Sequence, residues 1–140
     1  MQHLHENVAA IVVLAAQNLA TTSKIGDAID TRGYGGVEFL INYGTIAAST
    51  TTVAATVMES DSSTASTFTS VADADLVGTE ALASIAAVAR VAGSTSAVVK
   101  AIGYKGTKRY AKVKLKASAS SVGSVSAVLF HPALAPIPQT

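Results

Sequence analysis

Residues 97–117 read AVVKAIGYKGTKRYAKVKLKA, and this stretch decides the fold class. From residue 109 onward, one set of alternate positions holds Arg109, Ala111, Val113, Leu115 and Ala117, and the other set is mostly lysine. A period of two indicates a β-strand with one face on a core and the other in solvent or at an interface. Residues 97–104 predict a second strand, and KGT at 105–107 predicts a tight turn centred on Gly106.

The rest of the chain predicts further short strands separated by polar or glycine-rich turns. The strands are expected at 25–31, 37–43, 51–59, 67–71, 76–78 and 125–130. Residues 79–92 fit either a helix or a broken pair of strands. About eight short antiparallel strands favour an all-β fold, a jelly roll or other β-sandwich. We expect one domain at 25–131, an N-terminal arm and loop at 1–24, and a proline-containing C-terminal tail at 132–140.

The apolar run VAAIVVLAA at residues 8–16 is short for a transmembrane helix, which needs about 20 residues. The residues before it include His3, His5 and Glu6 but no lysine or arginine, unlike the start of a secretory signal. We therefore expect an arm that packs on its own domain or on a neighbouring molecule. Secretion, with cleavage near Ala20, is the alternative.

The composition disfavours a catalytic pocket. Alanine supplies 27 residues, and serine and threonine supply 15 each, while there are three Phe, four Tyr and no Trp. Small side chains suit thin, closely packed sheets, whereas ligand pockets are usually lined by aromatic and large apolar side chains. The absence of cysteine excludes disulfides, thiolate metal sites and a cysteine nucleophile.

The polar residues form no catalytic pattern. The three histidines are His3, His5 and His131. The first two have only Glu6 nearby as a third metal ligand. Asp73 and Asp75 are typical of a turn, and Asp27 and Asp30 have no base or nucleophile beside them. No nucleophile elbow or phosphate-binding glycine motif occurs, so we expect no enzyme activity, no cofactor, no metal and no small-molecule substrate.

Charge is divided unevenly along the chain. Residues 1–80 hold all nine acidic side chains and two basic ones, and residues 81–140 hold eight basic side chains and no acidic one. The halves are expected to pair within one fold or between copies, or the basic half offers a surface to a partner. The candidate interface residues are Lys105, Lys108, Arg109, Lys112, Lys114 and Lys116.

Two other uses of this basic hairpin compete with a protein interface. Outward lysines are a common means of preventing edge-to-edge strand pairing. Direct nucleic-acid binding is disfavoured, because the net charge is only +1 and a cross-strand pair accounts for Tyr104 and Tyr110.

Residues 98–138, VVKAIGYKGTKRYAKVKLKASASSVGSVSAVLFHPALAPIP, resemble a recurrent pattern in small structural proteins of tailed bacteriophages. In that pattern a strand ending in Val/Ile-Gly-Tyr is followed by x-Gly-x-Lys/Arg-Arg-Tyr, a long strand, a final strand and a proline-containing tail. RGYGGVEFLI at 32–41 and the passage 58–78 fit the same pattern. The chain departs from it at Phe130, where glycine is expected, and in HPALAP, which lacks a basic residue.

The resemblance is to capsid cement or decoration proteins, whose jelly-roll members sit as dimers or trimers across capsomer junctions. It implies a virion protein on the capsid exterior, assembled in the bacterial host cytoplasm, that binds the major capsid protein and bridges capsomers. A homodimer is favoured over a trimer, and no membrane is expected as a partner. The alternatives are another virion component (a tail, head-fibre or head–tail joining protein) and a secreted β-sandwich binding module.

Overall fold

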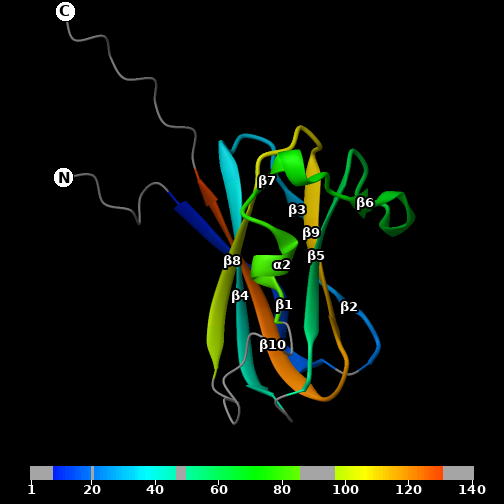
Figure 1. The fold of residues 1–140 in the computed structure, drawn as a ribbon. Helices are drawn as coiled ribbons and strands as arrows, with labels where there is room; N and C mark the ends of the chain where they lie inside the picture. Colours follow the sequence, from blue (N-terminus) through cyan, green and yellow to red (C-terminus); the bar gives the residue numbers. More distant parts are fainter. Residues whose placement is uncertain (1–7, 20, 47–49, 86–96, 131–140) are drawn as a thin grey trace, which may run out of the picture.

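The chain folds into two antiparallel β-sheets packed face to face (Figure 1). The computed structural model describes residues 8–19, 21–46, 50–85 and 97–130. Sheet A contains, in order, β1 (Val8–Leu19), β10 (Ser121–Phe130), β4 (Gly36–Ile46), β8 (Val98–Tyr104) and β7 (Leu76–Val77). Sheet B contains β2 (Lys24–Ile25), β9 (Tyr110–Ala117), β5 (Val53–Ser60) and β6 (Thr69–Ser70), and β3 (Ile29–Asp30) also pairs with β9. The short helical segments are η1 (Ala65–Thr67), η2 (Asp73–Asp75) and α2 (Glu80–Ala83).

The strand order is that of a jelly roll. The chain passes back and forth between the sheets, with a β5–β6 hairpin in sheet B. β9 returns to lie between β2 and β5, and β10 returns to lie between β1 and β4. The expected all-β sandwich is confirmed. The described strands number ten rather than about eight, because residues 8–19 form β1 and the strand expected at 25–31 is divided into β2 and β3, two pieces along one partner.

Alternation of side chains places the core between the sheets. The buried hydrophobic residues of strands β4, β9 and β10 are Val37, Phe39, Ile41, Tyr43, Ala111, Val113, Leu115, Ala117, Val125, Ala127 and Leu129. Three of these are alanines, so this chain fills a thin core with few aromatic rings. The expected strands over 37–43, 51–59 and 125–130 are confirmed by β4, β5 and β10.

The expected hairpin around Gly106 is wrong. β8 pairs with β4 and β7 in sheet A, whereas β9 pairs with β2, β3 and β5 in sheet B. Residues 105–109 therefore cross between the sheets, and Tyr104 and Tyr110 form no cross-strand pair. Alternation reveals that both segments are strands, but it carries no information about which strand each one joins.

The expected arm at residues 1–24 differs from the structure at residues 8–19, which form β1. This strand pairs with β10 from Val8↔Phe130 to Leu19↔Ser121, with irregular register between Val12 and Gln17. It buries Val13, Leu14 and Leu19 in the core, so its apolar run is used within the sandwich. Residues 1–7 and 131–140 lie outside the described residues.

α2 covers the side of the sandwich between β8 and β5 (Figure 1). The segment 79–92, expected as helix or strand, begins with this short helix. Thr79 caps it by accepting a hydrogen bond from the Leu82 amide at 3.2 Å, and Ile85 then forms a β-bridge with Val53. Residues 86–92 lie outside the described part of the chain.

Candidate protein interface

The six candidate interface residues do not form one patch. Lys105 and Lys108 lie in the connection between β8 and β9, Arg109 immediately precedes β9, and the other three lysines follow along that strand. A strand rises about 3.3 Å per residue, so roughly 20 Å separates the start of β9 from Lys116.

Two of the six basic residues pair with acidic side chains from the first half of the chain. Lys108 forms an ion pair with Asp61. Arg109 holds Asp30 bidentately, with Nη2 2.7 Å from Oδ2 and Nε 3.2 Å from both carboxylate oxygens. These hydrogen bonds hold the pKa of each carboxyl below its usual value. The acidic and basic halves thus pair within one fold, which was one of the expected outcomes.

Lys112 is buried, although the sequence places it on the lysine-bearing face. Its residue is 5% exposed, and its Nζ lies 3.7 Å from the centre of the Phe68 ring. Phe68 follows η1, so the polar loop after β5 folds over the outer face of β9. Burial lowers the pKa of Lys112, and the side chain is covered against a partner. Alternation along β9 cannot reveal cover supplied by a distant loop.

Lys105, Lys114 and Lys116 remain accessible. Lys114 lies beside its register partners Thr56 and Ile25, and Lys116 lies exposed beside Ala54. Within the described residues, none of the three lysines takes part in an ion pair. Lys114 and Lys116 therefore form a short, accessible basic strip on sheet B.

A hydrogen-bond network that the sequence did not predict joins the sheets beside Lys108. The Tyr104 hydroxyl donates to Glu59 Oε2 at 2.6 Å and accepts from the Lys108 amide at 3.1 Å. Burial, together with the Glu59 carboxylate, raises the pKa of Tyr104 above its usual value. The sequence predicted only that acidic residues of the first half pair with the basic half. It could not identify Glu59, Asp61 and Asp30 as the residues that make these contacts, because their spacing along the chain gives no signal.

The surface beside this network offers no catalytic arrangement. An open depression of about 330 Å³ is lined by Glu59, Ser60, Asp61, Ser62, Thr67, Thr69 and Lys108. Its charged groups already bind one another or Tyr104. Among the described residues no three His, Asp or Glu side chains gather as a metal site, and His3, His5 and His131 lie outside that part. No described helix has the length and hydropathy of a membrane span.

These features define a jelly-roll β-sandwich protein with a short basic strip on one sheet. No family model matches the chain, and no curated protein matches its sequence. The crystal structure of the PBSX exported protein XepA is similar, with a TM-score of 0.55, 15% identity and coverage of 89% of this chain and 37% of that chain. The chain thus spans little more than a third of that protein.

Two virus structures are more distant. The acidic stable capsid structure of Helicobacter pylori bacteriophage KHP30 has a TM-score of 0.43 and 15% identity, over 88% of this chain and 92% of that chain. The infectious bursal disease virus Gt strain structure has a TM-score of 0.45 and 13% identity, over 92% of this chain and 33% of that chain. Of these three structures, XepA alone has a TM-score above 0.5, and at 15% identity it indicates a common type of fold and nothing further.

Proposed function

We propose that the protein is a structural virion component, a cement or decoration protein that binds the outer surface of a phage capsid and bridges neighbouring capsomers. The observation that carries the proposal is the place of the motif that resembles phage structural proteins. Its residues 102–110 span the jelly-roll crossover from β8 to β9. The support comes from the contacts that the motif residues make at that crossover.

The glycines of the motif are required by close approach. A Cβ atom on Gly106 would lie 2.6 Å from the Tyr104 ring, and one on Gly103 would lie 2.9 Å from Val77 Cβ. Tyr104 then fixes the crossover through Glu59 and Lys108. The Gly-Tyr-x-Gly pattern therefore specifies how the chain passes from one sheet to the other, which supports a common jelly-roll design with the proteins that it resembles.

The place where the described strands begin and end suits a bridging protein. Val8 and Phe130 are register partners, so the start of β1 and the end of β10 lie side by side at one end of sheet A. In this proposal each of the two terminal segments contacts a neighbouring molecule, and so does the basic strip on sheet B. Several weak contacts made together give firm binding. In this proposal Lys114 and Lys116 meet an acidic part of the major capsid protein.

The test is to mix the purified protein with capsids assembled without it, and to examine them by cosedimentation and cryo-electron microscopy. We expect added density at capsomer junctions. The Lys114→Glu/Lys116→Glu variant is expected to bind at least tenfold more weakly, with a reduced dependence on salt. A double variant with the same change of charge elsewhere, Arg32→Glu/Lys100→Glu, is expected to bind like the wild type.

Bare capsids under conditions in which the protein is folded would contradict the proposal and favour another virion component or a secreted binding module. Equal loss of binding in both double variants would show that net charge, rather than the strip on β9, determines the contact.

A further inference from the structure

We propose that the outer face of sheet A is a self-association surface, on which a second copy of this chain packs back to back. This inference concerns the face opposite the lysines and does not depend on the proposed function.

The outer face of sheet A is unusually apolar for a surface. Of the nine large hydrophobic residues that are exposed in the described part of the chain, seven belong to strands of sheet A. Five of these point outward from the sheet: Val12, Val77, Val99, Val122 and Phe130. Val12 is 64% exposed and Val99 is 61% exposed. Exposed apolar side chains gathered on one face of a soluble protein are typical of interaction sites.

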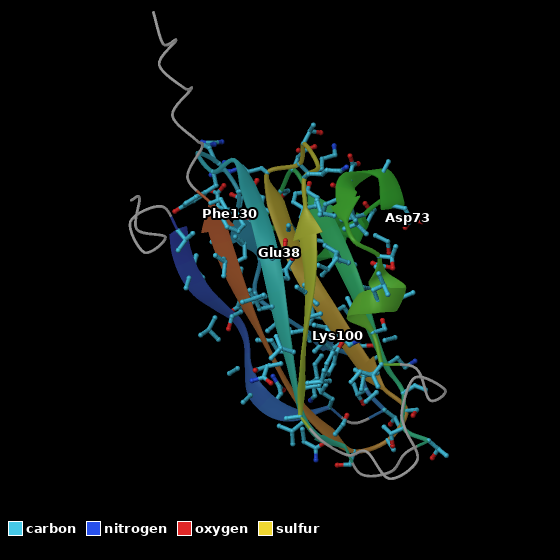
Figure 2. All side chains as sticks on the ribbon, turned by 60° about the vertical axis from the view of Figure 1, so that its left-hand side comes forward. Glu38, Asp73, Lys100 and Phe130 are labelled. Atoms are coloured by element: carbon cyan, nitrogen blue, oxygen red, sulfur yellow. The ribbon has the colours of Figure 1, made fainter. Side chains whose placement is uncertain are left out.

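The outward positions also carry very little charge. Register and burial place Glu38 on this face, between Val128 and Gly103, and it is the one charged residue among the described outward positions of sheet A. Figure 2 shows Glu38 and Phe130 near the same end of the sheet. The outer face of sheet B, in contrast, carries Lys114 and Lys116. The outer face of sheet A therefore suits an apolar partner, whereas the outer face of sheet B suits an acidic one.

The near absence of charge favours a second copy as the occupant. In a two-fold interface the same patch meets itself, so a patch with charges of one sign would repel its copy, whereas a nearly uncharged patch does not. A charged partner would find only Glu38 to bind. Desolvation raises the pKa of Glu38, which lowers the cost of covering this carboxyl.

The size and relief of the face fit such an interface. Four long strands about 4.8 Å apart and about 30 Å long give roughly 600 Å² before side-chain relief is added. A standard interface buries about 800 Å² on each partner. Small residues stand between the valines, including Ala10, Ala101, Ser124 and Ser126, so a second sheet can approach to the usual spacing of about 10 Å.

The first test is the mass of the full chain by sedimentation velocity from about 1 to 200 μM. We expect a dimer for the wild type. Val12→Lys and Val99→Lys are expected to weaken it at least tenfold, because each places an ammonium group in the interface. Leu82→Lys is the matched control: Leu82 is 67% exposed but lies on α2, so this variant should remain dimeric. A monomeric wild type, or a dimer that survives both face variants, would overturn the proposal.

A second measurement does not depend on the stability of lysine variants. The chain has no cysteine, so single cysteines report on proximity without interference. Ser126→Cys, outward at the middle of β10, is expected to give a covalent dimer with a short bis-maleimide, whereas Ser70→Cys on β6 is not. Equal cross-linking at both positions would contradict back-to-back packing.

The capsid experiment separates this inference from the proposed function. If the chain is monomeric and Val99→Lys abolishes capsid binding, the face belongs to the capsid protein and the inference is wrong. If the face variants abolish the dimer while the wild type fails to bind capsids, the inference stands and the proposed function fails.

Discussion

At the residue scale, Lys112 and Asp30 show how differently the fold treats charged side chains. Lys112 is covered by Phe68, and its pKa is lowered because burial disfavours the ammonium form. Asp30 remains at the surface, and its pKa is lowered because Arg109 donates hydrogen bonds to the carboxylate. The first shift destabilises the folded state at neutral pH, and the second stabilises it.

Replacing the buried ammonium group is therefore expected to stabilise the protein. Lys112→Met removes the buried charge and replaces the cation–π contact with the Phe68 ring by a sulfur–aromatic contact, so we expect the relief of desolvation to raise the free energy of unfolding at pH 7 by about 0.5–1 kcal/mol. In the wild type, stability should rise with pH as it passes from the lowered pKa toward the ordinary value of 10.5. Urea unfolding measures both effects. Lys116→Met is the exposed control, and a gain of the same size there would show that burial of Lys112 is not the cause.

The Asp30 carboxylate gives the opposite dependence on pH. Its lowered pKa means that the Arg109 contact stabilises the fold above the pKa of the unfolded chain, and that this stabilisation is lost as pH falls through the folded-state pKa. Asp30→Asn is expected to be less stable than the wild type at pH 7 and equally stable near pH 2. Asparagine still accepts from the Arg32 amide, so the turn is retained. A difference that is unchanged between the two pH values would rule out the ion pair as its origin.

At the element scale, the edge of β5 that faces away from β9 is satisfied largely by side chains, because β6 pairs with it only at Met58 and Glu59. Glu80 Oε1 accepts from the Val57 amide at 2.7 Å, and Ser84 Oγ accepts from the Ala55 amide at 2.9 Å. Val53 exchanges two backbone hydrogen bonds with Ile85. The segment from α2 to Ile85 thus protects this edge from pairing with another molecule.

Removing the Glu80 carboxylate leaves a partly buried amide without its acceptor. We expect Glu80→Ala to lower the free energy of unfolding by about 1.5–2 kcal/mol, and Glu80→Gln to lower it by less, because the carboxamide oxygen still accepts. Hydrogen exchange of the Val57 amide should accelerate in Glu80→Ala before other β5 amides change. Equal effects of the two substitutions would indicate that packing of α2, rather than this hydrogen bond, is responsible.

At the scale of the whole molecule, a few hydrogen-bonded links outside the core tie the sheets together within the described residues. Besides the Tyr104 network, the adjacent Gly26 and Asp27 amides form one link, because they donate to Val113 on β9 at 2.9 Å and to Val13 on β1 at 2.8 Å. The Tyr43 hydroxyl of β4 forms another by donating to Ala83, close to Ile85, which bonds to Val53 on β5.

Tyr104→Phe is expected to cost about 1.5–2 kcal/mol, since it removes a hydrogen bond to a carboxylate and one from the Lys108 amide. The ring itself stays buried, so the fold should be retained. Differential scanning calorimetry would measure the lowered melting temperature. Tyr43→Phe, which removes a single hydrogen bond to the Ala83 carbonyl, is the comparison and is expected to cost less. An equal or larger loss in Tyr43→Phe would contradict the role given to the network.

Apart from β1, which was expected as an arm, the sequence alone determined which segments are strands and which of their faces point into the core. Strands alternate with a period of two, and turns need glycine or small polar residues, so this information is local and can be read from neighbouring positions. For that reason β4, β5, β9 and β10 were predicted within a few residues, and the jelly roll or sandwich class followed from their number and spacing.

Only the tertiary structure decided the partners of each strand. β1 pairs with β10 across more than a hundred residues, and β8 and β9 join different sheets although five residues separate them. The same long-range packing decided the candidate site. Phe68 covers Lys112, Asp61 and Asp30 engage Lys108 and Arg109, and Lys105, Lys114 and Lys116 stay accessible. Pairing and cover depend on contacts between distant segments, and alternation within a single strand carries no record of them.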